Sequence, residues 1–198
     1  MNYLRFLSSL ILSLGLVTSA CGASMKTPDI KQNPHPTQRH EVTMMIDGAP
    51  GAFDAIESYV KYQVMNPQCV PMHEGSGATP TIEKSVPISL TKTGEHSFKG
   101  SFYSDLLQDE DYFGMGVCRW SVVATGARLK VRSVVFSPDL SKTDIESHQP
   151  DVTYFAKESF SAQNAASDVE VGSEVTPFIT QHPDKFFSVT LTVGENTK

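Results

Sequence analysis

The run VCRWSVVATGARLKVRSVVF, from Val117 to Phe136, carries the strongest β-strand signal in the chain. Valine and aromatic residues are frequent in it, and apolar residues alternate with polar ones as they do in half-buried strands. The pattern predicts two strands, Val117–Ala124 and Leu129–Phe136. Thr125 and Gly126 separate them and are interpreted as a turn.

The same two-residue period recurs on both sides of this run. It predicts further short strands at 42–46, 56–64, 86–90, 98–102, 152–160 and 186–193. Residues two apart in a strand point to the same side of a sheet. One buried face of the last strand is therefore expected to carry Phe187, Val189, Leu191 and Val193.

Two local signals suggest how these strands are arranged. The turn residues Lys92 to Glu95, with Gly94 among them, indicate a hairpin that leads into the strand at 98–102. Pro87 lacks the N–H group that a central strand needs, so its strand is expected at a sheet edge or at a strand start. About seven short strands without a helical period predict an all-β fold, an antiparallel β-sandwich.

Length and charge narrow the possible classes of function. The chain has 198 residues, a length typical of one domain. Its 22 acidic and 16 basic side chains give a formal charge of −6. Nucleic acid requires a basic surface on its protein partner, so it is not expected to be a partner here.

The first twenty residues have the three parts of an export signal. Arg5 supplies the positive charge, and the stretch from Phe6 to Val17 is mostly apolar. Small residues at 18–20 then suit a signal peptidase. Removal of this segment deletes Arg5 and no acidic residue, so the mature chain carries a formal charge of −7.

The sequence Thr18-Ser19-Ala20-Cys21 resembles the lipobox of bacterial lipoproteins. The resemblance covers the signal region alone, and Thr18 stands where leucine is usual. It implies that Cys21 becomes the first residue and carries lipid, which anchors the protein to a membrane. Gly22 in place of aspartate implies sorting to the outer membrane, facing the periplasm. The polar, proline-containing residues 21–40 are interpreted as the lipidated end and a flexible tether, and residues 41–198 as a single sandwich domain.

With Cys21 assigned to lipid by this resemblance, Cys69 and Cys118 remain, and an oxidising periplasm is expected to join them. Strand alternation places Trp120 on the same face as Cys118, beside this disulfide. Disulfide–tryptophan packing is also found in immunoglobulin-like sandwiches, although there the two lie on different strands. The similarity is used only as an analogy.

Enzyme motifs are weak in this chain. Ser89-Leu90-Thr91-Lys92 matches S-x-x-K, but its lysine also begins the only K-T-G, whereas penicillin-recognising enzymes keep the two motifs far apart. The histidines are scattered along the sequence: His35, His40, His73, His96, His148 and His182. No catalytic residue and no cofactor are therefore predicted.

The segment from Asp105 to Gly116 is the most distinctive one for function, and three interpretations remain open. It can be a solvated loop fixed by its aromatic residues. It can bind Ca²⁺ through carboxylates at positions 105, 109 and 111, although the EF-hand spacing is absent. It can also contact a basic protein, with charge steering the encounter and buried rings holding the complex. The residues expected to make this contact are Asp109, Glu110, Asp111, Tyr112 and Phe113.

The chain as a whole resembles small envelope lipoproteins of proteobacteria, a group that includes immunity proteins. This resemblance implies a lipid-anchored periplasmic inhibitor or immunity protein that neutralises a basic toxin or hydrolase of the cell envelope. The alternative is an envelope-assembly lipoprotein that binds a small ligand or Ca²⁺ without enzymatic activity.

Overall fold

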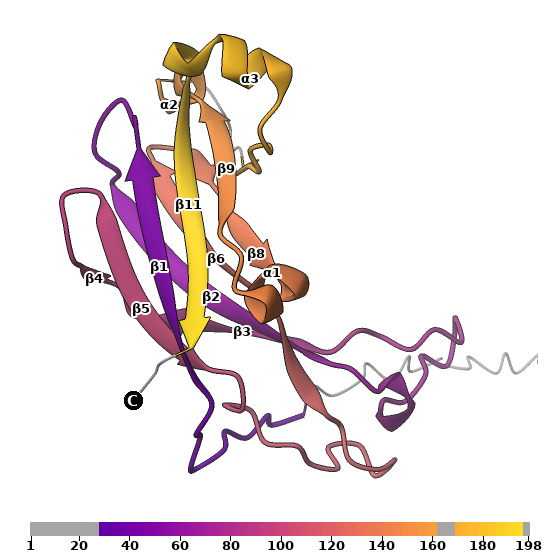
Figure 1. Cartoon of the computed structure of the whole chain (residues 1–198). Helices are drawn as coiled ribbons and strands as arrows, with labels where there is room; N and C mark the ends of the chain where they lie inside the picture. Colours follow the sequence, from indigo (N-terminus) through magenta and orange to yellow (C-terminus); the bar gives the residue numbers. More distant parts are fainter. Residues whose placement is uncertain (1–27, 162–168, 196–198) are drawn as a thin grey trace, which may run out of the picture.

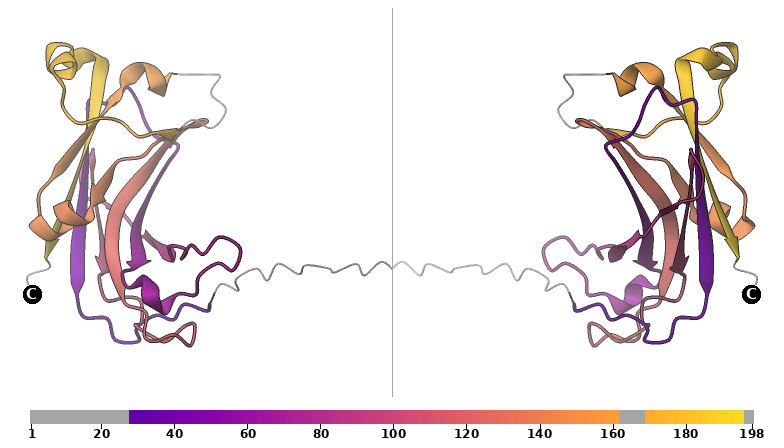
Figure 2. Two further views of the ribbon diagram at one scale, coloured as in Figure 1. Left: turned by 90° about the vertical axis from the view of Figure 1, so that its right-hand side faces the viewer. Right: turned by 90° about the vertical axis from the view of Figure 1, so that its left-hand side faces the viewer.

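The computed structural model describes residues 28–161 and 169–195. Two β-sheets pack face to face, as Figures 1 and 2 show. The all-β sandwich that the alternating sequence predicts is therefore confirmed. Within the described ranges, no helix is long and apolar enough to cross a membrane.

The two sheets are built as follows. The five-stranded sheet has the order β4 (Thr91–Lys92), β5 (Ser97–Tyr103), β1 (Arg39–Asp47), β11 (Phe186–Glu195) and β9 (Asp151–Ala156). The six-stranded sheet has the order β10 (Val169–Glu170), β7 (Val134–Phe136), β6 (Trp120–Val131), β2 (Ala55–Val64) and β3 (Glu83–Ile88), and β8 (Asp139–Ser141) also pairs with β6. All pairings are antiparallel except that of β10 with β7, which is parallel.

The helical elements are short and lie in the connections between strands. They are η1 (Pro67–Cys69), α1 (Lys142–Ser147), α2 (Lys157–Phe160), α3 (Pro177–Gln181) and η2 (Pro183–Lys185). Helix α1 begins with a capping box, because the Ser141 hydroxyl accepts from the Asp144 N–H and the Asp144 carboxylate accepts from the Ser141 N–H. Figure 1 places α2 and α3 together at one end of the sandwich.

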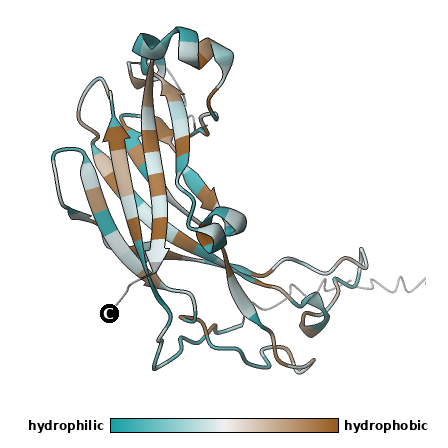
Figure 3. Cartoon of the chain, viewed as in Figure 1, coloured by the Kyte–Doolittle hydropathy of each residue, from teal (hydrophilic) through white to brown (hydrophobic). Residues whose placement is uncertain are grey.

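The core lies between the sheets and follows the predicted alternation. The four residues expected to share a face of β11, from Phe187 to Val193, are all buried. Figure 3 shows the same alternation as apolar and polar bands along the strands. Pro87 lies in β3 at the edge of its sheet, and β4 and β5 form the predicted hairpin. These three predictions are confirmed.

Strand β6 differs from the prediction, because Thr125 and Gly126 lie inside one continuous strand rather than in a turn. The pairing with β2 shifts register between Lys61 and Tyr62, so β6 contains a β-bulge at Val123. A bulge inserts one residue and reverses which face the following residues point to. That change of phase resembles a break between two strands in the sequence. The actual turn to β7 contains Arg132, which has a φ of 52°.

The Cys69–Cys118 disulfide is present, with a Cα–Cα distance of 5.3 Å. Cys69 ends η1 just after β2, and Cys118 lies just before β6. Because β2 and β6 are neighbours in the same sheet, this disulfide does not cross between sheets. The analogy with the disulfide of immunoglobulin-like sandwiches therefore does not extend to its position.

Candidate functional site

One end of the sandwich, opposite α2 and α3, is formed by loops, and we call it the loop end. It consists of residues 28–38, 65–82 and 104–119, which lie side by side in Figures 1 and 2. Backbone hydrogen bonds connect residues 31 and 33 with 108 and 106, and residue 65 with 119. The disulfide adds a covalent link between the second and third segments. The segment singled out in the sequence therefore sits on a fixed base.

The N-terminal segment belongs to this base. The Asn33 N–H donates to the Leu106 carbonyl at 2.7 Å, and Gln32 forms a bridge with Leu107. Strand β1 already begins at Arg39. This differs from the tether predicted to extend to residue 40, because residues from about 31 onward are bonded to the loop end. Cys21 and residues 21–27 lie outside the described residues.

Asp105 joins the N-terminal segment to the loop. Its carboxylate accepts hydrogen bonds from the Thr37 and Gln38 backbone N–H groups at 2.8 and 3.0 Å, and from the Thr37 hydroxyl. Desolvation alone would raise the pKa of this carboxyl group, but the hydrogen bonds outweigh it and hold the pKa below its usual value. Asp105 is therefore a structural acceptor.

The next three carboxylates also have partners within the chain. Asp109 Oδ1 accepts from the Trp120 N–H at 2.9 Å, and Asp111 Oδ1 accepts from the Met115 N–H at 3.0 Å. Glu110 forms an ion pair of 2.6 Å with Lys31. Each carboxylate thus shapes the loop with one oxygen. The side chains of Asp109 and Asp111 remain exposed, so their charges still face solvent.

The two aromatic residues of the segment pack onto the disulfide. Tyr112 and Phe113 are half-buried against a small core of Val64, Cys69, Val70 and Cys118, which lies apart from the main core. Trp120 contacts both cores, which confirms its predicted place beside the disulfide.

The Tyr112 and Trp120 rings also meet edge to face, with centroids 6.3 Å apart. The Tyr112 hydroxyl donates to the Gln108 carbonyl at 2.6 Å. Partial burial raises the pKa of this phenol. The loop is therefore closed by its own aromatic ring.

The loop end also exposes large apolar side chains that the sequence did not single out. Met65, Met72, Met115 and Val117 are 47%, 65%, 51% and 49% exposed. All four lie in or next to the two segments that the disulfide joins. Methionine adapts its shape to different partners, which makes it frequent at promiscuous binding surfaces. In the sequence, this exposed apolar surface was indicated by three methionines that lie between the predicted strands.

The carboxylates do not assemble a cation site. In the ranges 28–161 and 169–195, no group of three or more histidine, cysteine, aspartate or glutamate side chains is placed to hold a metal ion. The oxygens of Asp105, Asp109 and Asp111 instead accept N–H groups. Calcium binds through six to eight converging oxygens, an arrangement that these three residues do not form.

A serine–histidine contact borders the loop end. His40 Nε2 lies 3.1 Å from Ser104 Oγ, and the His40 ring stacks on Phe102. The Ser104 hydroxyl donates to Gln38 Oε1 at 2.9 Å, so its proton points away from His40. Two adjoining hollows of about 470 and 390 Å³ share Gln38, Ser104 and Trp120. The contact links β1 to the chain just after β5.

No protein-family model, curated protein or solved structure matches this chain significantly.

Proposed function

We propose that this protein is a lipid-anchored, non-enzymatic binding protein of the bacterial envelope whose loop end docks a basic protein. In this role it acts as an inhibitor or immunity protein against an envelope-targeting toxin or hydrolase. The observation that carries the proposal is the combination at the loop end. Exposed methionines lie beside half-buried rings on a disulfide-linked base, and exposed Asp109 and Asp111 border them. Interfaces commonly have an apolar centre and a polar rim.

The proposed anchor places this surface close to the membrane. Six residues separate Cys21 from Pro28, the first described residue, and the seven Cα–Cα steps between the two span at most about 25 Å when fully extended. Pro28 belongs to the loop end. A lipid on Cys21 would therefore keep Pro28 within that distance of the bilayer, and the loop end would face the membrane region where an attacking enzyme of the envelope acts.

The anchor is tested by the variant Cys21→Ser. Without the thiol no lipid can be attached, so we expect the protein to move from the membrane fraction to the soluble periplasmic fraction. Stable membrane anchoring normally depends on more than one acyl chain, and the variant would carry none. The loss of membrane association should therefore be nearly complete. Fractionation followed by immunoblotting measures this. Ala20→Gly, a substitution by another small residue, serves as a control that should remain in the membrane fraction. Continued membrane association of Cys21→Ser would refute lipid anchoring at this residue.

The docking surface is tested first by site-specific photocrosslinking in intact cells. A photoreactive residue at position 72 should trap a basic envelope protein, whereas the same residue at position 178 should not. Phe178 is also exposed, at 54%, but lies in α3 at the opposite end. Mass spectrometry identifies the trapped protein. Equal trapping from both positions, or trapping of acidic proteins only, would contradict the proposal.

The charge contribution is then measured with Asp109→Asn plus Asp111→Asn. Asparagine keeps an oxygen that can accept the same N–H groups, so the loop should keep its shape while it loses two negative charges. We expect association with the trapped partner to slow about tenfold at low salt, and its salt dependence to flatten. The matched control is Glu158→Gln plus Asp184→Asn, which removes two exposed charges near the other end. If both double variants bind alike, the charged rim has no role.

A further inference from the structure

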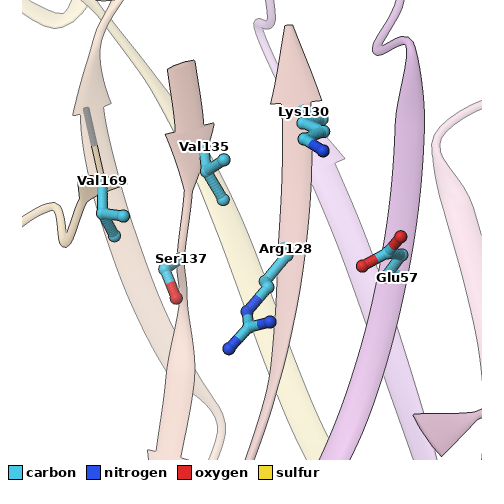
Figure 4. A pocket seen from close by; sticks show the side chains of 6 residues that line it. All are labelled: Glu57, Arg128, Lys130, Val135, Ser137 and Val169. Atoms are coloured by element: carbon cyan, nitrogen blue, oxygen red, sulfur yellow. The ribbon is translucent and has the colours of Figure 1, made fainter. Parts of the chain in front are cut away.

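The outer face of the six-stranded sheet carries a hollow of about 290 Å³, far from the loops discussed above. It is lined by Glu57, Arg128, Lys130, Val135, Ser137 and Val169. They lie on β2, β6, β7 and β10 or at the end of β7, which are neighbours in the sheet, and Figure 4 shows their side chains. A second hollow of about 650 Å³ adjoins the first and shares Glu57 and Arg128 with it. The proposal below is independent of the docking function.

Strand register explains why charged side chains meet here. Glu57 pairs with Arg128 across β2 and β6, and Ala55 pairs with Lys130. The residues between the two cations and on either side, Ala127, Leu129 and Val131, are buried in the core. Alternation therefore turns Arg128 and Lys130 outward, two residues apart on one strand. The sheet therefore fixes the points on β6 from which the two cationic side chains extend.

Arg128 is oriented by an aromatic ring rather than by the carboxylate opposite it. Its guanidinium carbon lies 5.4 Å from the centre of the Tyr59 ring, a cation–π contact. In Figure 4 the guanidinium group points toward the β7 side, away from Glu57. Gly126 makes room for this arrangement, because a Cβ atom there would lie 2.9 Å from the Tyr59 hydroxyl. The Arg128 guanidinium is thus held in position before any ligand binds, and no carboxylate forms an ion pair with it among the described residues.

The charge of these two cations is left available. In the described part of the chain, Lys31, Lys61, Lys99 and Lys142 each have a glutamate within 4.0 Å. Arg128 and Lys130 form no ion pair among the same residues, even though Glu57 is nearby. The hollow therefore carries two positive charges against one negative charge. Beside them lie the apolar side chains of Val135 and Val169, the latter 62% exposed.

We propose that this hollow binds a small organic anion with a short aliphatic tail. Arg128 and Lys130 bind the anionic head group, since charge-assisted hydrogen bonds from such cations are the strong ones. The Ser137 hydroxyl donates a further hydrogen bond. The tail lies against Val135 and Val169. A site with a few converging polar groups beside apolar walls is typical of small-molecule recognition. The single carboxylate of Glu57 opposes binding and limits the affinity.

The test uses hexanoate as the probe and the ¹⁵N-labelled full chain as the protein. We expect saturable shifts of the backbone amide signals in β6 and β7, because the anion sits over these strands. Arg128→Gln and Lys130→Gln should each raise the dissociation constant about tenfold. Glu57→Gln should lower it about threefold, because the substitution removes a repelling charge. Lys84→Gln, a matched change of an exposed cation outside this hollow, should leave it unchanged.

Two further probes separate the parts of the proposed ligand. Hexanol has the tail without the charge, and inorganic phosphate has charge without the tail; both should bind at least tenfold more weakly than hexanoate. The opposite responses of Arg128→Gln and Glu57→Gln distinguish binding in the hollow from a general loss of structure, which would weaken binding in both variants. The proposal is overturned if hexanoate gives no saturable shift, if hexanol or phosphate binds as well, or if Lys84→Gln weakens binding as much as Arg128→Gln.

Discussion

Replacing Cys69 and Cys118 together by alanine should lower the free energy of unfolding by about 4 kcal/mol. The two residues are 49 positions apart in sequence. Joining them removes much of the conformational freedom of the unfolded chain, and this loss grows with the length of the closed loop. Urea denaturation of the wild type and the double variant measures the change. Both cysteines are replaced so that no lone thiol remains.

Reduced wild-type protein is the matched control for this prediction, and it should be destabilised by about the same amount. A much larger effect in the variant than after reduction would point to lost packing of the side chains around Cys118, which is fully buried. A change below about 1 kcal/mol would show that the unfolded chain already keeps these segments together, so that the chain-entropy account fails.

The double cysteine variant should also affect the loop end more strongly than the two sheets. Strands β2 and β6 are paired over ten residues of β2, and that pairing does not depend on the disulfide. The small core of Val64, Val70 and the half-buried Tyr112 does depend on it, because the disulfide is at its centre. Hydrogen exchange of the strand amides should therefore rise only as far as the lower global stability requires, and that of the loop-end amides should rise further, because this end also opens locally.

The strands were predictable because their burial follows a local pattern. Phe187 to Val193 alternate without interruption, and all four expected residues are buried. In β6 the pattern changes phase, and the sequence does not distinguish a bulge from a turn. The choice between a bulge and a turn depends on a contact with a residue distant in the sequence. Gly126 pairs with Asp139 of β8, which lies beyond the turn to β7, and this pairing keeps the strand continuous.

The location of the candidate site could be predicted from the sequence, but the roles of its residues could be predicted only in part. The segment around Asp109 and Tyr112 was recognised by its composition alone. Composition counts Asp105 as a surface charge, whereas its carboxylate accepts two backbone N–H groups that lie 68 and 67 positions away. The polar, proline-containing composition of residues 21–40 similarly predicted a flexible tether. Partners so distant in sequence leave no local signal, so the role of such residues is visible only in the fold.

The second large effect is expected at the other end of the sandwich, with Phe136→Ala. Phe136 is fully buried, and its ring lies 5.1 to 6.2 Å from the rings of Phe53, Phe155, Phe160 and Phe187. These rings come from both sheets and from the connections between them. Removing the central ring leaves a cavity that the surrounding strands cannot close, at a cost of about 3–5 kcal/mol. Urea denaturation measures this change.

Phe178→Ala is the control for the aromatic cluster. Phe178 is 54% exposed on α3, so its loss should cost less than about 1 kcal/mol. Equal effects of the two substitutions would mean that the five rings do not pack as a core. Phe136→Leu should fall between them, because leucine refills part of the space.

Combining Phe136→Ala with the double cysteine variant tests whether the sandwich unfolds as one unit. The disulfide lies at the loop end, and Figure 1 places the α2 end, to which Phe160 belongs, at the opposite end. Substitutions without shared contacts normally add within about 0.5 kcal/mol when they act on one cooperative transition. The combined loss is then about 7–9 kcal/mol, within the range of total stability of a typical domain, so the triple variant should be largely unfolded without denaturant. If the strands instead stay folded while the loop end exchanges freely, the loop end unfolds separately, and the disulfide stabilises that end alone.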